Sequence, residues 1–127
     1  YINDMPECSS SDIRLFADDS LLYRTIRTPE DNLALQRDLD ALEKWEKTWL
    51  MSFNATKCYV LHISADKSRC KTSEHTYRLH GQALESVDHS KYLGVSISNN
   101  LSWNQHIQNV TAKGNRTLGF VKRNLKE

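Results

Sequence analysis

The sequence lacks a long apolar run, a leader segment and closely spaced cysteines. No stretch of about 18 apolar residues occurs in the 127 residues, so no membrane span is predicted. The chain begins at Tyr1 rather than methionine and shows no charged-then-apolar leader, so we expect an unsecreted protein and an excerpt of a longer one. Its three cysteines, Cys8, Cys58 and Cys70, include no Cys-x-x-Cys pair. A reducing compartment, nuclear or cytosolic, is therefore expected.

Two cysteine–histidine pairs raise the question of a zinc site. Cys58 precedes His62 with three residues between them, and Cys70 precedes His75 with four. Neither spacing matches a zinc knuckle or a zinc finger, and His62 falls in an apolar stretch. Packing or surface roles for these side chains are favoured over zinc.

The composition is that of an ordinary soluble domain, with 39% hydrophobic and 26% charged residues. The net charge of +1 conceals an uneven distribution along the chain. Residues 1–51 carry 11 acidic and 6 basic residues, whereas residues 101–127 carry 1 acidic and 5 basic ones. An acidic front can gather metal ions and a basic tail can contact phosphate. The same distribution is common in proteins that touch no nucleic acid.

Two apolar runs meet at the tetrapeptide Phe16-Ala17-Asp18-Asp19. No glycine, proline or asparagine separates them, so residues 17–19 are predicted to form the reversal of a tight β-hairpin spanning residues 12–24. Adjacent carboxylates repel each other unless a cation lies beside them. Mg²⁺, or Mn²⁺ in its place, is the simplest such cation, because it accepts a few carboxylate oxygens and completes its shell with water and phosphate. A solvated Asp-Asp turn is the alternative.

A helix is predicted after the hairpin, with Thr28 as the N-cap and Pro29 in the first helical position. Apolar residues recur on one helical face, which is expected to pack on the sheet of the hairpin, while the acidic residues, Asp38 included, take the remaining faces. The stripe comprises Leu35, Leu39, Leu42, Trp45 and Trp49.

Shorter elements follow. We expect a turn at residues 54–57, a strand at 58–63, a flexible loop at 64–74 and a hairpin at 76–87 around Gly81. Residues 91–97 are predicted to form another strand, in which Gly94 marks a bulge or a close backbone approach. Ser102 and Gln105 predict a capping box at the start of a last, amphipathic helix, which its two glycines make dependent on neighbours. Its apolar stripe comprises Trp103, Ile107, Val110, Gly114, Leu118, Val121 and Leu125.

These motifs together resemble the reverse transcriptases of non-LTR, LINE-type retrotransposons. Phe16-Ala17-Asp18-Asp19 is similar to the aromatic-x-Asp-Asp box of that family, and residues 1–6 resemble the short helix end and loop that precede it. The two tryptophans before Phe53-Asn54-x-x-Lys57-Cys58, the segment Lys91-Tyr92-Leu93-Gly94-Val95 and the last helix follow in the family's order. The resemblance covers essentially all 127 residues.

The resemblance implies an α+β fold that is part of a polymerase palm and the start of a thumb. The palm part would be a β-hairpin carrying Asp-Asp, with a helix packed on a small antiparallel sheet, at residues 1–75. Residues 76–98 would form a hairpin like a primer grip, and residues 99–127 would begin the thumb.

The resemblance also implies roles for individual residues. Asp18 would ligate the metal ion directly, with Asp19 beside it, and Phe16 would lie close to the primer end. Lys57 would lie near the phosphates of the incoming nucleotide, although an ordinary turn lysine is an equal alternative. The substrates would be an RNA template, a DNA primer and deoxynucleoside triphosphates. The remaining nucleic-acid contacts would come from Tyr92, Gly94, Lys113, Arg116 and Arg123.

The family's polymerases need parts that this sequence does not show. These are another aspartate on a strand beside the hairpin, fingers that hold the nucleotide and a segment that screens the sugar. Asp4, Glu7 and Asp12 are the only carboxylates before the box, and none matches that aspartate. The chain alone is therefore expected to be an inactive fragment. Two alternatives are a non-catalytic retroelement remnant that at most binds nucleic acid, and a structural module supported only by the amphipathic helices.

Overall fold

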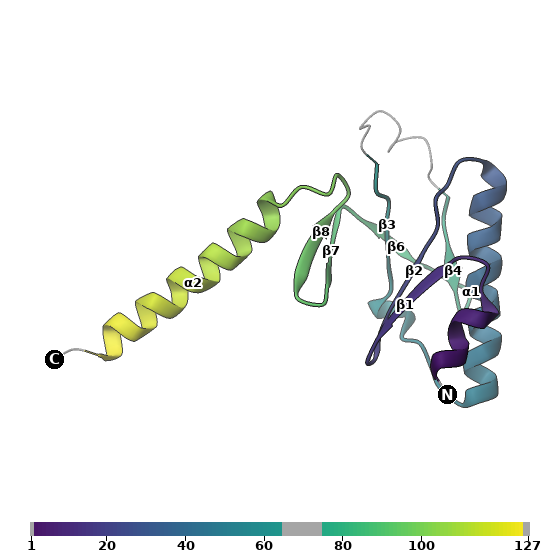
Figure 1. The fold of residues 1–127 in the computed structure, drawn as a ribbon, viewed down its shortest axis with the longest axis horizontal. Helices are drawn as coiled ribbons and strands as arrows, with labels where there is room; N and C mark the ends of the chain where they lie inside the picture. Colours follow the sequence, from purple (N-terminus) through teal and green to yellow (C-terminus); the bar gives the residue numbers. More distant parts are fainter. Residues whose placement is uncertain (1, 65–74, 126–127) are drawn as a thin grey trace. The chain divides into compact units, whose positions relative to one another are not determined.

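The computed structural model describes residues 2–64 and 75–125. The chain has an α+β fold of helices and small two-stranded sheets (Figure 1). It divides into two compact units, which are treated separately: the hairpin unit, Tyr1–Val60 with Ser73–Ser86, and the C-terminal unit, Leu61–Thr72 with Val87–Glu127. Among the described helices, none combines the length and the apolar character needed to cross a membrane.

Along the chain, η1 and the first two strands precede the long helix α1, and short strands then lead to the second long helix, α2. Paired strands form the sheets β1–β2, β3–β6, β4–β5 and β7–β8. The elements are η1 (Ile2–Cys8), β1 (Asp12–Phe16), β2 (Asp19–Tyr23), α1 (Pro29–Trp49), η2 (Ala55–Lys57), β3 (Tyr59–Leu61), β4 (Arg78–Leu79), β5 (Gln82–Ala83), β6 (Glu85–Val87), β7 (His89–Tyr92), β8 (Val95–Ser98) and α2 (Asn104–Asn124).

Helix α1 begins where the sequence predicts. Thr28 is its N-cap, with an extended backbone, and Pro29 follows as the first helical residue, where its missing N–H costs nothing. The carboxylate of Asp31 accepts hydrogen bonds from the backbone N–H groups of Arg27 (2.9 Å) and Thr28 (3.0 Å), which otherwise lack partners at a helix start. Leu50 ends the helix in the left-handed region, at φ +53°.

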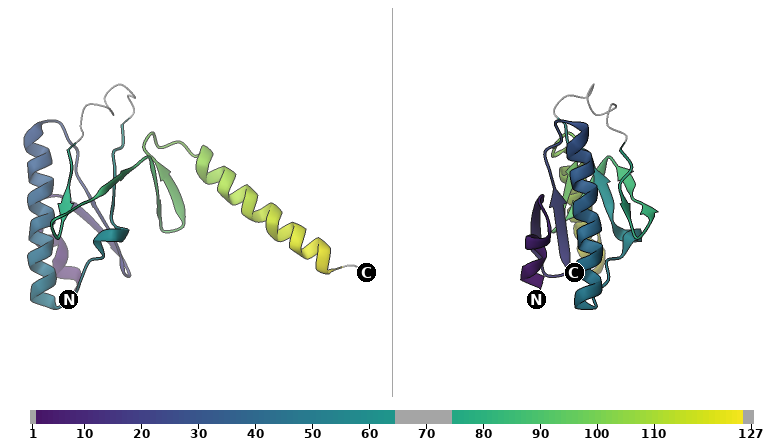
Figure 2. Two further views of the ribbon diagram at one scale, coloured as in Figure 1. Left: turned by 180° about the vertical axis from the view of Figure 1, so that it is seen from behind. Right: turned by 90° about the vertical axis from the view of Figure 1, so that its right-hand side faces the viewer.

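The core of the hairpin unit lies between α1, η1 and the β1–β2 hairpin, which slants away from α1 toward its tip in Figure 1. Figure 2 shows the same unit from two further sides. The apolar residues of the strands alternate with outward residues, so one face of the hairpin meets the helix stripe. The prediction that α1 packs on the hairpin is confirmed. The buried centre is formed by Met5, Leu42 and Trp45, with Ile13, Leu15, Leu22 and Phe53 packed around it.

The predictions for Trp49 and for the segment before β1 were wrong. Trp49, placed on the buried stripe, is 40% exposed because it is the last residue of α1, beyond the packed hairpin core. The segment before β1 is a 3₁₀-helix through Cys8 rather than a helix end and loop within residues 1–6.

Strand β4 is held on α1 by side chains rather than by a wider sheet. Gln36 accepts from the N–H of Arg78 and donates to its carbonyl, both at 2.9 Å, so a helix side chain replaces a neighbouring strand. Tyr77 donates from its hydroxyl to Asn32 at 2.8 Å. Of the hairpin predicted at 76–87, only the centre is present, as β4–β5, with His80 at φ +52° and Gly81 at φ +72° in its turn. Residues 85–87 instead form β6, which pairs with β3.

The C-terminal unit contains a hairpin where a single strand was predicted. β7 and β8 pair with Tyr92 opposite Val95, so Leu93 and Gly94 form a two-residue turn, at φ +48° and +83°. A Cβ added at Gly94 would meet no atom of the described part of the chain within 4 Å. The glycine therefore serves the left-handed backbone of the turn and not a close approach.

Helix α2 begins two residues after the predicted cap. Ser102 accepts from the N–H of Asn104 at 3.3 Å, but Asn100, not Gln105, accepts the N–H of Ser102 at 3.0 Å. The predicted capping box is therefore not formed: the N-cap is Trp103, and it makes no side-chain cap bond. The apolar stripe of α2 is exposed along the described helix, which has no buried residue.

Of the loop predicted at 64–74, residues 65–74 lie outside the described residues, as does Cys70 of the hypothetical zinc pairs.

Candidate catalytic hairpin

The tetrapeptide Phe16-Ala17-Asp18-Asp19 forms the tip of the β1–β2 hairpin. Phe16 pairs with Asp19, so the two-residue turn consists of Ala17 and Asp18, while Asp19 is already the first residue of β2. Ala17 has φ +52°, a left-handed conformation that a residue with a Cβ adopts at a cost of about 1–2 kcal/mol. The predicted reversal is confirmed, and strained backbone of this kind is often found at functional sites.

The two faces of the hairpin differ in what they contact. Ile13 and Leu22 are cross-strand partners on the inner face, where they pack against α1 and η1. On the outer face Phe16, which is 62% exposed, lies opposite Asp19. Leu21 and Tyr23 continue the exposed apolar surface of this face along β2. The hairpin therefore presents a carboxylate beside an open aromatic surface.

The donor atoms at the tip suit a hard divalent cation. Asp18 and Asp19 are both exposed and supply carboxylate oxygens, the ligands that Mg²⁺ and Mn²⁺ prefer. Within the described ranges, no group of three or more His, Cys, Asp or Glu residues is placed to hold a metal ion. The two aspartates thus fit such an ion as part of its shell, with the other ligands coming from water, phosphate or further protein groups.

Lys57 ends the short helix η2, in the same unit as the hairpin. Its backbone N–H donates to the carbonyl of Asn54 at 2.9 Å, and the side chain of Asn54 accepts from the N–H of Thr56 at 3.1 Å. The lysine side chain is exposed, on a turn whose backbone is held by these bonds. The turn predicted at residues 54–57 is present, and the role of Lys57 stays a prediction.

The other predicted contact residues belong to the C-terminal unit. Tyr92 ends β7 half-buried, and Gly94 lies in the following turn. Helix α2 contains no acidic residue, and three of its exposed side chains are the predicted Lys113, Arg116 and Arg123. The structure thus brings Phe16, Asp18 and Asp19 together on one hairpin. The other five residues lie in the second unit, on β7, in the turn after it and on α2.

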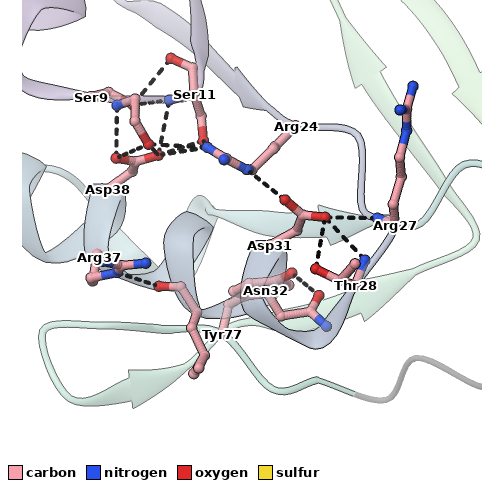
Figure 3. A network of polar contacts seen from close by, with 12 residues as sticks. Ser9, Ser11, Arg24, Arg27, Thr28, Asp31, Asn32, Arg37, Asp38 and Tyr77 are labelled. Carbon is pink, nitrogen blue, oxygen red and sulfur yellow. Dashed lines mark hydrogen bonds and ion pairs between the residues drawn. The ribbon is translucent and has the colours of Figure 1, made fainter.

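A buried carboxylate at the base of the hairpin was missed by the sequence analysis. Asp38 of α1 was expected at the surface, but it is only 5% exposed. It lies on the same helical face as Ala34, Leu42 and Trp45, at steps of four, four and three, and that spacing was the available signal. Ser10, just before β1, donates to it from its N–H and hydroxyl groups. Ser11 does the same (Figure 3).

The lowered pKa values of Asp38 and Asp31 predict that the hairpin unit loses stability in acid. Burial raises the pKa of Asp38, but hydrogen bonds from Ser11 and Ser10 outweigh it and hold the pKa below its ordinary value of 3.8. Hydrogen bonds from the backbone of Arg27 and Thr28 likewise lower the pKa of Asp31. A carboxyl whose pKa is lower in the folded state stabilises the fold above its unfolded pKa, and this contribution is lost as the pH falls through the folded pKa.

Urea unfolding midpoints measured from neutral pH to below 3.8 should therefore fall on the acid side of that value. An Asp31→Asn, Asp38→Asn double variant should show a flatter acid limb, whereas Asp40→Asn, at an exposed position of the same helix, should keep the wild-type slope. An unchanged slope in the double variant would contradict the assignment.

Two curated proteins are similar to the chain. The RNA-directed DNA polymerase from mobile element jockey of Drosophila melanogaster is 26% identical over 119 residues, which cover 87% of this chain and 13% of that protein. Its counterpart from Drosophila funebris is 31% identical over 96 residues, covering 75% of this chain and 10% of that protein. The chain thus spans only a small part of these relatives' length. No protein-family model and no solved structure matches it.

Proposed function

We propose that this chain, which belongs by sequence to the reverse transcriptases of non-LTR retrotransposons, supplies the metal-binding hairpin of an RNA-directed DNA polymerase. One observation carries the proposal: Asp18 and Asp19 lie at a tight hairpin tip, beside the exposed ring of Phe16. The substrates would be an RNA template, a DNA primer and deoxynucleoside triphosphates. In this proposal residues 1–75 and 76–98 belong to the palm and its primer-gripping hairpin, and residues 99–127 begin the thumb.

The chemistry proposed is nucleotidyl transfer supported by divalent metal ions. Bound Mg²⁺ would supply positive charge that favours ionisation of the primer 3′-hydroxyl and departure of pyrophosphate. Asp18 would ligate the ion from the turn, and Asp19 would do so from the first position of β2. Phe16, on the outer face, would offer the primer end an aromatic surface, and the packed inner face would keep the tip in place.

The other residues would hold the substrates. Lys57 would stabilise negative charge on the departing pyrophosphate. Tyr92 and the turn containing Gly94 would contact the primer strand. The absence of acidic residues from α2 favours contact with nucleic-acid phosphates through Lys113, Arg116 and Arg123.

A non-catalytic remnant that only binds nucleic acid is the second candidate. The acid-free helix α2 supports it equally well, but the retention of both aspartates favours catalysis.

Primer extension tests the proposed function. The protein that carries this chain, here called the parent polymerase, should extend a DNA primer on an RNA template with Mg²⁺, stop when EDTA is added, and resume when Mg²⁺ is restored. The chain by itself should not extend the primer, because its two aspartates make only part of a metal site. Extension that persists in EDTA, or a parent polymerase that binds template–primer but never extends it, would overturn the proposal.

Lys57→Ala should lower kcat by about 10²-fold, because one positively placed group at the departing phosphates is lost. The affinity for template–primer should stay nearly constant, since a single exposed charge contributes little to that binding. Lys47→Ala removes the same charge from an exposed position near the end of α1 and serves as the control. Single-turnover incorporation and filter binding measure the two effects. Equal rates for the two variants would leave Lys57 as an ordinary turn lysine.

A further inference from the structure

The hairpin that carries Asp18 and Asp19 is fastened at its base to one carboxylate of α1. Ser10 donates from its N–H to Asp38 Oδ1 at 2.8 Å, and Ser11 donates from its N–H to Oδ2 at 2.9 Å. The hydroxyl of Ser10 lies 3.1 Å from Oδ2, and the hydroxyl of Ser11 also donates there. These serines lead directly into β1. The carboxylate of Asp38 therefore holds the backbone in place where the hairpin begins.

The other end of the hairpin meets the same carboxylate through Arg24, the residue after β2. Its guanidinium Nη1 lies 3.9 Å from Asp38 Oδ2 and donates to the hydroxyls of Ser10 (3.0 Å) and Ser11 (3.3 Å). Its Nε lies 3.5 Å from Asp31 Oδ1 at the start of α1. Figure 3 shows Asp38, Ser11, Arg24 and Asp31 as one continuous network. Both strands are thus tied to the helix at one point.

We propose that Asp38 is a positioning residue, which sets the angle of the hairpin on α1 and thereby the place of the two metal-binding aspartates. This inference rests on the proposed function. Apolar packing of Ile13, Leu15 and Leu22 keeps the hairpin on the helix, but the hydrophobic effect has no direction and permits sliding and tilting. Hydrogen bonds to a charged acceptor are short and directional, so they select one angle.

The length of the hairpin makes the angle matter. Each strand has five residues, so the tip lies about 16 Å from the base at about 3.3 Å per residue. A tilt of about 5° at the base then moves the tip by about 1.4 Å. Displacements near 1 Å at a reacting centre lower rates by about 10²-fold. Asp38, which is remote from the tip, can therefore govern the metal site without touching it.

Asp38→Asn in the parent polymerase tests the proposal. The amide keeps the size of the side chain but loses the charge and one acceptor oxygen, so the angle of the hairpin is less firmly set. Asp40→Asn makes the same change at an exposed position of α1 and is the matched control. Mn²⁺ binding, measured by electron paramagnetic resonance of the free ion, should weaken by about ten-fold in Asp38→Asn and not in Asp40→Asn. The Mg²⁺ concentration for half-maximal extension, measured per titrated active site, should rise by about the same factor.

Ser10→Ala provides a second, milder variant, because it removes one hydroxyl and leaves both backbone N–H donors to Asp38. It should raise the half-maximal Mg²⁺ concentration by a smaller factor in the same direction, even if Asp38→Asn fails to fold. A role in stability alone would lower the fraction of active enzyme and leave the metal dependence per active site unchanged. That outcome would overturn the inference.

Asp18→Ala, measured in parallel, separates this inference from the proposed function. If Asp18→Ala abolishes extension while Asp38→Asn and Ser10→Ala keep the wild-type metal dependence, only the positioning role of Asp38 fails. If Asp18→Ala extends primers normally, the proposed function fails, and the positioning role fails with it.

Discussion

Asp18→Ala in the parent polymerase is expected to lower nucleotide incorporation by about 10³-fold or more, with template–primer affinity nearly unchanged. The alanine keeps the small size that the turn accommodates but removes both carboxylate oxygens of the residue. Asp18 lies on the turn itself. In the described ranges no third His, Cys, Asp or Glu residue joins the two aspartates, so no other side chain can replace a lost ligand. Binding of the template and primer depends on other surfaces, so it should survive.

Asp12→Ala is the control for this experiment. Asp12 is exposed in the same hairpin, but it opens β1 at the base and pairs with Tyr23, far from the tip. Both variants remove one negative charge from the hairpin, so a rate loss confined to Asp18→Ala reports on position rather than charge. Single-turnover incorporation measures the chemical step, and filter binding measures the affinity. Normal incorporation by Asp18→Ala would refute the catalytic assignment.

Trp45→Ala should destabilise the hairpin unit by about 3–5 kcal/mol, the usual cost of deleting a large core side chain. Trp45 is 5% exposed, shares the buried centre with Met5 and Leu42, and stacks on Phe53 with ring centroids 6.2 Å apart. Native domains are stable by about 5–15 kcal/mol in total, so the loss should remove a large share of the unit's stability and lower its urea midpoint strongly. Urea unfolding followed by circular dichroism measures the change.

Two further tryptophan variants define the cause. Trp45→Phe should cost far less than Trp45→Ala, because most of the ring volume remains and the buried indole Nε1 makes no hydrogen bond to any described residue. Trp103→Ala, at a residue 61% exposed before α2, should leave the hairpin unit unchanged. If Trp103→Ala and Trp45→Ala were equally destabilising, the core assigned here would be wrong.

The elements that the sequence predicts well are those with local causes. The β1–β2 hairpin follows from alternation within a dozen residues, and the start of α1 follows from Thr28, Pro29 and Asp31, which lie within one helical turn. The burial of Asp38 was missed because its partners Ser10 and Ser11 are 28 and 27 residues away, and its place on the face of Ala34, Leu42 and Trp45 was the only local sign of it. Only the folded chain brings them together.

Turns with unusual residues were the second source of error. Residues 91–97 were assigned to one strand because Leu93-Gly94 lacks the asparagine–glycine signal of a hairpin turn. A leucine in the left-handed region, as at Leu93, is uncommon and is not expected from the sequence. For the candidate site, the resemblance identified Asp18, Asp19 and Phe16, and the structure adds their places on turn and strand. The predicted contacts of Tyr92, Gly94, Lys113, Arg116 and Arg123 depend on bound nucleic acid, which neither the sequence nor the isolated chain contains.

The two-residue turn at Ala17 and Asp18 has a consequence for how this segment can diverge between copies of the element. Away from Phe16 and Asp19, substitutions on the outer face of the strands change only exposed contacts, so drift there should be tolerated. An insertion or deletion of one residue in either strand would instead exchange inner and outer faces beyond that point, placing Ile13 or Leu22 in solvent. Length should therefore persist between residues 12 and 23 even where residue identity has been lost.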